Sequence, residues 1–129
     1  MNILLVMIGG FFGAITRYGI GEWIHINNGF PFGTFCINLT GSLVLGWLLT
    51  FISQRRKGMK RLSLFVGTGF LGSYTTFSTF SVETINLIAN KEYFFAILYV
   101  FLSVALGLVF AFLGYKLAIL NNKEKVDVL

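Results

Sequence analysis

A run of hydroxyl side chains is the part of this sequence best suited to chemistry. Residues 72–81 read Gly-Ser-Tyr-Thr-Thr-Phe-Ser-Thr-Phe-Ser, and five of the seven residues from Thr75 to Ser81 carry a hydroxyl group. The run lies inside a long apolar segment, and lipid offers no partner to polar groups or to interrupted backbone. Such polarity at membrane depth is tolerated where it is buried in protein or lines a cavity, and it often marks an ion or substrate site. The run therefore predicts a site.

The segment around this run, residues 62–90, is too long for one straight membrane helix. Its 29 residues would extend about 43 Å as an α-helix, against a hydrocarbon core of about 30 Å. Gly67, Gly69 and Gly72 precede the hydroxyl run, so we expect the helix to be broken there, near its middle. The alternative is an intact helix in which each hydroxyl donates to a carbonyl one turn earlier.

Two other apolar stretches carry polar residues at helical spacing. Thr34, Asn38 and Ser42 follow one another at steps of four, and so do Tyr99 and Ser103. Residues four apart share one face of a helix, so each set forms a polar stripe. Taken alone, either stripe could be interhelical hydrogen bonding that holds a bundle together. Their coincidence with the hydroxyl run favours a hydrated track through the membrane.

Two charged residues lie within the apolar stretches. Arg17 lies towards the end of the first, and Glu83 follows the hydroxyl run. A charge inside the membrane is costly unless it is paired or hydrated, so both are candidates for a functional role. The alternative for Arg17 is that its side chain reaches the membrane interface. The sequence assigns no task to Glu83.

Composition places the chain among integral membrane proteins. Of its 129 residues 56% are hydrophobic and 12% are charged, and the mean hydropathy is +0.80. A soluble domain needs more charge to cover its surface. The net charge of +5 does not indicate nucleic-acid binding, because the basic residues gather in one loop and the tail. A single Cys and a single His exclude a disulfide framework and a Cys/His metal cluster. No catalytic motif is present, so we expect no enzyme activity.

We expect one all-α membrane domain over residues 1–129. Four apolar stretches can each cross the membrane as a helix, at about 3–24, 32–52, 62–90 and 93–120, and residues 121–129 form a polar cytoplasmic tail. The first stretch is not a signal peptide, because it lacks a basic start, contains Arg17 and precedes three more. The pair of Gly9 and Gly13 predicts close helix packing in a tight bundle or dimer.

Three motifs combine these residues in a fixed order and spacing. They are Gly9-Gly10-x-x-Gly13-Ala14-x-x-Arg17-Tyr18, Gly33-Thr34-x-x-x-Asn38-x-x-Gly41-Ser42, and Gly69-Phe70-x-Gly72-x-x-Thr75-Thr76-Phe77-Ser78-Thr79-Phe80-Ser81-x-Glu83. Over residues 3–120 the chain resembles the CrcB/Fluc family of fluoride channels. The resemblance implies a passive, fluoride-selective channel that exports cytoplasmic fluoride and so confers fluoride resistance. It also implies four-helix subunits in an antiparallel, dual-topology-type dimer with two pores and a central structural sodium ion, Na+.

The resemblance also implies roles for individual residues. Phe77 and Phe80 correspond to the two pore phenylalanines, and the backbone carbonyls of Gly72 and Thr75 correspond to the sodium ligands. Arg17 corresponds to a basic residue near a vestibule. The polar track corresponds to Thr34, Asn38, Ser78, Thr79, Tyr99 and Ser103.

The chemistry of fluoride suits these residue types. Fluoride is small and strongly hydrated, so a pore must replace its water with hydrogen-bond donors. Hydroxyls and the Asn38 amide donate without adding a charge that would trap the ion. The edge of a phenyl ring is positive and contacts an anion weakly. The sequence departs from the family at Gly107 and Val109, where members often carry hydroxyls, so the lining of that end of the track stays unassigned.

Two other classes stay open. A proton-coupled antiporter of the small four-helix type needs a titratable carboxylate in mid-membrane, for which Glu83 is the candidate. A membrane scaffold without transport is the second alternative, and it leaves the polarity of Asn38 and of the hydroxyl run unexplained.

The distribution of basic residues predicts the orientation in the membrane. Four spans place both termini and the loop between the second and third spans on one side. That side carries eight of the ten basic residues, namely Arg55, Arg56, Lys57, Lys60, Arg61, Lys116, Lys123 and Lys125. Because Lys and Arg favour the cytoplasmic side, we expect a multi-pass protein of the cell (plasma) membrane with both termini cytoplasmic. An antiparallel homodimer needs both orientations, so we expect pairing with a related, oppositely inserted subunit, with a homodimer as the alternative.

Overall fold

The computed structural model describes residues 2–24, 29–54 and 59–126, and all regular structure within these ranges is helical. The elements in chain order are α1 (Asn2–Trp23), α2 (Phe32–Ser53), α3 (Lys60–Leu62), the π-helix η1 (Ser63–Leu71), α4 (Gly72–Tyr74), α5 (Phe77–Ala89) and α6 (Tyr93–Val126). The expected all-helical class is confirmed. Helices α1, α2 and α6 are long and apolar enough to cross a membrane. The expected third span consists of shorter pieces, of which the longest, α5, has 13 residues.

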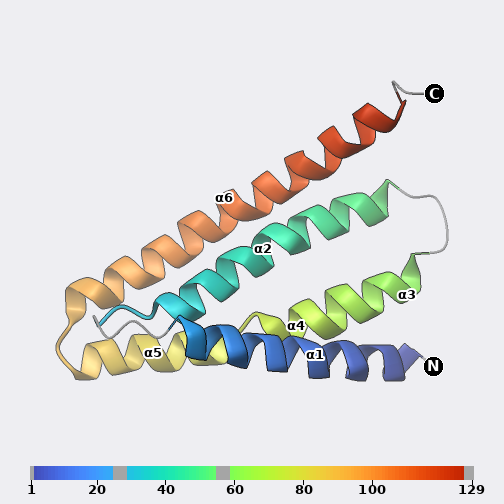
Figure 1. Cartoon of the computed structure of the whole chain (residues 1–129). Coiled ribbons are helices and arrows are strands. Elements are labelled where there is room, and N and C mark those ends of the chain that lie inside the picture. The colour runs from blue at the N-terminus through green and yellow to red at the C-terminus, as the bar shows by residue number, and fades with distance from the viewer. Residues whose placement is uncertain (1, 25–28, 55–58, 127–129) are drawn as a thin grey trace.

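The helices form two close pairs. Helix α1 runs along η1 and α4, and helix α2 runs along α6 (Figure 1). Contacts of α5 with α6, and of α2 with η1, join one pair to the other. The start of α1, the end of α2, α3 and the end of α6 lie at one end of the molecule, and the turn between α5 and α6 lies at the opposite end (Figure 1).

Glycines let the backbones within each pair approach closely. A Cβ on Gly9 or Gly13 would overlap a backbone carbonyl oxygen of η1, which for Gly13 belongs to Phe70. In the other pair, a Cβ on Gly114 of α6 would overlap the Leu43 carbonyl oxygen of α2. Lipid supplies no hydrophobic drive for helices to associate, so such close packing is what holds them together. The packing role predicted for Gly9 and Gly13 is confirmed.

Two buried apolar clusters lie on either side of the junction between α4 and α5. The first joins the start of α2 to α5 and α6, and the second joins α2 to η1 and α4. Their buried members are Phe30, Leu87, Ala96 and Tyr99 in the first, and Ile37, Leu48, Leu71 and Tyr74 in the second. The junction, where the hydroxyl run begins, is therefore held from both sides.

Candidate functional site

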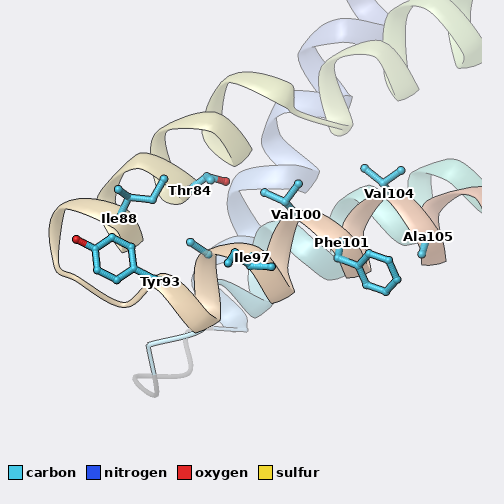
Figure 2. Close-up of a pocket in the computed structure, with 9 residues that line it drawn as sticks. Thr84, Ile88, Tyr93, Ile97, Val100, Phe101, Val104 and Ala105 are labelled. Carbon is cyan, nitrogen blue, oxygen red and sulfur yellow. The ribbon is translucent and has the colours of Figure 1, made fainter.

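A wide groove between α5 and α6 is apolar. Its volume is about 630 Å³, and its lining includes Ile88, Ile97 and Val104 (Figure 2). The Thr84 hydroxyl in its wall donates to the Phe80 carbonyl oxygen at 2.8 Å, one helical turn earlier. The groove suits lipid chains or another apolar surface, so the polar site must lie elsewhere.

The backbone between α4 and α5 is extended, with φ −73° and ψ 153° at Thr75 and φ −145° and ψ 123° at Thr76. Asn38 of α2 faces this stretch. Its Oδ1 accepts from the Thr76 N–H at 2.8 Å, and its Nδ2 donates to the Thr76 carbonyl oxygen at 2.9 Å. One side chain thus satisfies both backbone groups of Thr76, which lipid would leave unpaired.

The extended stretch lies beyond the glycines that were expected to interrupt the helix. Gly67 and Gly69 lie inside η1, and Gly72 begins α4. The physical reason is that Asn38 provides partners at Thr76, and that the Thr76 side chain caps the start of α5 by accepting from the Thr79 N–H at 3.1 Å. The position of the helix interruption is therefore set by where hydrogen-bond partners exist for the unpaired backbone groups, more than by where the glycines lie.

Two backbone carbonyls next to this stretch lose their helical donors. In a continuous α-helix the Thr76 N–H would donate to the Gly72 carbonyl, and the Thr79 N–H would donate to the Thr75 carbonyl. Both N–H groups donate elsewhere, to Asn38 Oδ1 and to Thr76 Oγ1. The carbonyls of Gly72 and Thr75 are therefore left with electron pairs that can accept other partners.

The hydroxyl run divides into two kinds of side chain. The Thr75 and Ser81 hydroxyls donate to carbonyls one turn earlier, at 2.8 Å and 2.9 Å, as in the intact-helix alternative. Those of Thr76, Ser78 and Thr79 instead form a cluster, in which Thr76 Oγ1 lies 3.0 Å from Thr79 Oγ1 and 3.3 Å from Ser78 Oγ. This cluster of Thr76, Ser78 and Thr79 is therefore the part of the run whose hydroxyls contact one another rather than a carbonyl of the preceding turn.

Glu83, to which the sequence assigned no task, joins three helices. Its Oε1 accepts from the Thr34 hydroxyl of α2 at 2.8 Å, and its Oε2 accepts from the Tyr99 hydroxyl of α6 at 2.8 Å. The Tyr99 side chain is fully buried. Two residues predicted for the polar track therefore use their donors on this carboxylate, which holds them in place.

A groove of about 340 Å³ brings together four of the predicted pore residues, Asn38, Phe77, Phe80 and Ser103. The Phe80 ring lies between its neighbours, with centroid distances of 5.9 Å to Phe77 and 5.0 Å to Tyr99. The Phe77 ring is 80% exposed. The Ser103 Oγ is buried and has no hydrogen-bond partner among the described residues. The wall of the groove thus holds two aromatic rings and a serine whose hydroxyl is unused among the described residues.

A second hollow of about 310 Å³ contains four more of the charged and polar candidates. Its lining includes Arg17, Thr34, Thr79 and Glu83, and Thr76 lines both this hollow and the groove. The predicted vestibule residue is thereby placed beside the predicted track. Ser78 is exposed at the start of α5 and belongs to neither lining.

The family resemblance assigned no role to two contributors to these linings, although the sequence patterns contained both. Thr76 belonged to the hydroxyl run but was not assigned to the pore. The available indication was that a Thr is a common helix N-cap residue and that Thr79 follows it by three residues. Ser42 lines the groove as well, and its place in the stripe with Thr34 and Asn38 was the available indication.

These features define a class, namely a small helical membrane protein with neutral hydrogen-bond donors gathered at a helix junction. A family model described as "CrcB-like protein, Camphor Resistance (CrcB)" matches residues 4–115. The chain belongs to the CrcB family, which confirms the resemblance seen in its motifs.

Proteins described as fluoride-specific ion channels resemble the chain over most of its length. The fluoride-specific ion channel FluC of Oceanobacillus iheyensis is 52% identical over 124 residues, which cover 96% of each chain. Bacillus thuringiensis subsp. konkukian (strain 97-27) has two relatives. Fluoride-specific ion channel FluC 1 is 46% identical over 116 residues, covering 88% of this chain and 85% of the relative. FluC 2 is 45% identical over 119 residues, covering 91% and 97%.

Proposed function

We propose that this chain forms a passive, fluoride-selective channel that exports cytoplasmic fluoride, and that it is not an enzyme. The names of its relatives support fluoride as the ion. The observation that carries the proposal is the groove of Asn38, Phe77, Phe80 and Ser103, in which a buried hydroxyl lacks a partner among the described residues. A neutral wall of donors binds a small anion without holding it so tightly that it cannot leave.

Several of the lining residues have distinct tasks along this path. The Arg17 guanidinium attracts the anion into the hollow that it lines together with Thr79 and Thr76. The second hydrogen on Asn38 Nδ2 is available for the anion, because only one is used on the Thr76 carbonyl. The ring edges of Phe77 and Phe80 and the Ser103 hydroxyl complete the path.

Fluoride efflux from liposomes that contain only this purified chain tests the proposal. We expect loaded liposomes to release fluoride, detected with a fluoride electrode, and to retain chloride under the same gradient. Release of both ions at similar rates would refute fluoride selectivity, and release of neither, from this chain alone and from this chain together with an oppositely inserted relative, would refute a channel.

Two subunits are needed to enclose the path, and we propose an antiparallel dimer. The exposure of Phe77 supports this arrangement, because its ring lies at the mouth of a groove that one subunit leaves open. A large aromatic ring beside a polar groove gains from a second protein wall more than from lipid, since lipid cannot complete a polar path.

We propose a structural sodium ion at the carbonyls of Gly72 and Thr75. Their donor set fits such an ion, because carbonyl oxygens suit hard cations and these two have lost their helical donors. When bound, sodium supplies a fixed positive charge close to the anion path. A Cβ at Gly72 would meet only the Gly67 carbonyl oxygen, at 3.9 Å, within the subunit, so this surface is open towards a partner.

Removal of sodium should lower the stability of the assembly without changing what is transported. We expect the melting temperature in detergent to fall when sodium is replaced by a large organic cation, because like dipoles of the freed carbonyls then face one another. In liposomes no sodium should move with fluoride, which a radioactive sodium tracer checks. Stoichiometric movement of sodium with fluoride would contradict a structural ion.

A proton-coupled antiporter is the second candidate, because Glu83 is a carboxylate that lines the hollow beside Arg17. We expect Glu83→Gln to slow fluoride efflux but not to abolish it, since the amide oxygen still accepts from one of the two hydroxyls while the other loses its acceptor. Efflux of the wild-type chain should be independent of a proton gradient. Flux that follows the proton gradient and vanishes in Glu83→Gln would favour the antiporter.

We propose that both termini are cytoplasmic and that the usual partner is a related chain of opposite orientation, with a homodimer as the alternative. The start of α1, the end of α2 and the end of α6 lie at one end of the molecule, which supports one charged side (Figure 1). The strain of B. thuringiensis with both FluC 1 and FluC 2 supports the existence of related pairs.

Thiol labelling in intact cells tests the orientation. In a Cys36→Ala background, we expect Gln54→Cys, at the end of α2, to resist a membrane-impermeant reagent until the cells are opened. Asn90→Cys, at the opposite end beyond α5, is the matched control and should react at once. Equal reaction of both positions in intact cells would refute a fixed orientation, and with it the case for an oppositely inserted partner.

A further inference from the structure

The polar path on α6 has a gap one turn beyond Ser103. Tyr99 and Ser103 lie four residues apart, and the next position at this spacing is Gly107. Residues at such spacing share one helix face, so Gly107 lies on the face that carries the two hydroxyls. Glycine brings no donor, and α6 alone therefore cannot continue the path.

Ser42 of α2 lies opposite this gap. A Cβ built on Gly107 would lie 3.9 Å from Ser42 Oγ. Ser42 also lines the groove that contains Phe77 and Ser103. Its hydroxyl therefore occupies the direction in which a side chain at position 107 would extend.

We propose that Ser42 lines the fluoride path and supplies the hydroxyl that Gly107 lacks, so that the path crosses from α6 to α2 after Ser103. This inference rests on the proposed fluoride channel. It assigns the end of the track that the sequence left unassigned. It also implies that the path needs one hydroxyl here, which either position 42 or position 107 can supply.

The present hydrogen bond of Ser42 permits this role. Its Oγ donates to the Asn38 carbonyl oxygen at 2.8 Å, and that carbonyl lies within α2, where it also accepts the regular helical bond. A rotation about χ1 exchanges this second, neutral bond for one to the anion. Hydrogen bonds to a charged partner are about twice as strong as neutral ones, so the exchange is favourable when fluoride arrives.

Fluoride efflux of Ser42→Ala provides the first test. We expect a rate about tenfold below wild type per folded protein, because one donor to a charged ion is lost. The matched control is Ser53→Ala, whose hydroxyl makes a similar bond on the same helix, to the Thr50 carbonyl oxygen at 2.8 Å, but is exposed. Its rate should equal that of wild type.

Rescue at position 107 separates a donor from a packing role. In the Ser42→Ala background, Gly107→Ser should restore most of the lost rate, whereas Gly107→Ala should not. A rate for Ser42→Ala equal to wild type overturns the inference, and so does rescue by Gly107→Ala as complete as rescue by Gly107→Ser. Absence of fluoride efflux from wild type would instead refute the proposed channel itself.

A second substitution keeps the test decisive if Ser42→Ala folds poorly. Ser42→Thr keeps the hydroxyl and Ser42→Gly removes it, and each can be compared at equal amounts of protein eluting at the wild-type position in size exclusion. We expect the Thr variant to remain within about threefold of wild type and the Gly variant to lose about tenfold. A Thr variant as slow as the Gly variant overturns the inference.

Discussion

Replacing Phe80 with Ile should reduce fluoride efflux to the level of liposomes without protein, while the subunit still folds. Ile fills much of the same space but has no ring edge to present to an anion. Phe80 packs against Phe77 and Tyr99 with centroid distances of 5.9 Å and 5.0 Å, and the loss of such aromatic contacts costs about 1 kcal/mol beyond the area. Efflux and thermal unfolding in detergent, measured on one preparation, separate the two effects.

Two further variants complete this experiment. Phe77→Ile should also stop efflux, with a smaller effect on stability because the Phe77 ring is 80% exposed in the subunit. Phe94→Ile is the matched control, since Phe94 is an exposed phenylalanine of α6 outside the groove. It should conduct normally. Normal efflux in both Phe77→Ile and Phe80→Ile would contradict the assignment of the pore.

Replacing Asn38 with Ala should destabilise the protein more than any other single polar substitution described above. The change leaves the N–H and the carbonyl of Thr76 without their partner. A buried backbone group left unsatisfied costs about 1–3 kcal/mol, so the two together predict a loss of about 2–6 kcal/mol. Unfolding in detergent, followed by circular dichroism against temperature or denaturant, measures the loss.

Asn38→Asp and Asn86→Ala serve as comparisons. Asp keeps an oxygen for the Thr76 N–H, but an ionised carboxylate is costly to bury and repels the Thr76 carbonyl oxygen, so at neutral pH Asn38→Asp should be at least as unstable as Asn38→Ala. Asn86 is an exposed residue of α5, and its replacement should be nearly neutral. An Asn38→Ala protein that unfolds like wild type would show that Asn38 does not support the helix junction.

The sequence predicted the helical class and four of the residues that line the groove, namely Asn38, Phe77, Phe80 and Ser103. Apolar length and glycine spacing give the helices, and steps of four place Asn38 on the face that meets α5. Family motifs added Phe77 and Phe80, which no pattern would have selected among 15 phenylalanines. Each of these inferences uses a pattern that lies within a single helix, so none requires knowledge of how the helices pack.

The role of Glu83 could not be predicted in this way. Its two acceptor bonds join Thr34 and Tyr99 from separate helices, and only the packing of α2, α5 and α6 decides that they meet. The same holds for the helix junction, whose position depends on Asn38 rather than on the neighbouring glycines. The sodium ion, the antiparallel partner and the cytoplasmic termini involve an ion, a second chain and a membrane, and they stay predictions.

The contact between Asn38 and Thr76 has a consequence for biosynthesis. Synthesis proceeds from the N-terminus, so α2 emerges from the ribosome before the segment that carries Thr76. Extended backbone alone in lipid would cost several kcal/mol for each unpaired group. The segment that ends in α5 therefore integrates against an α2 that is already in the bilayer, rather than as an independent span. Substitutions that remove the Asn38 amide should accordingly appear first as low yields of inserted protein, and only then as slow conduction.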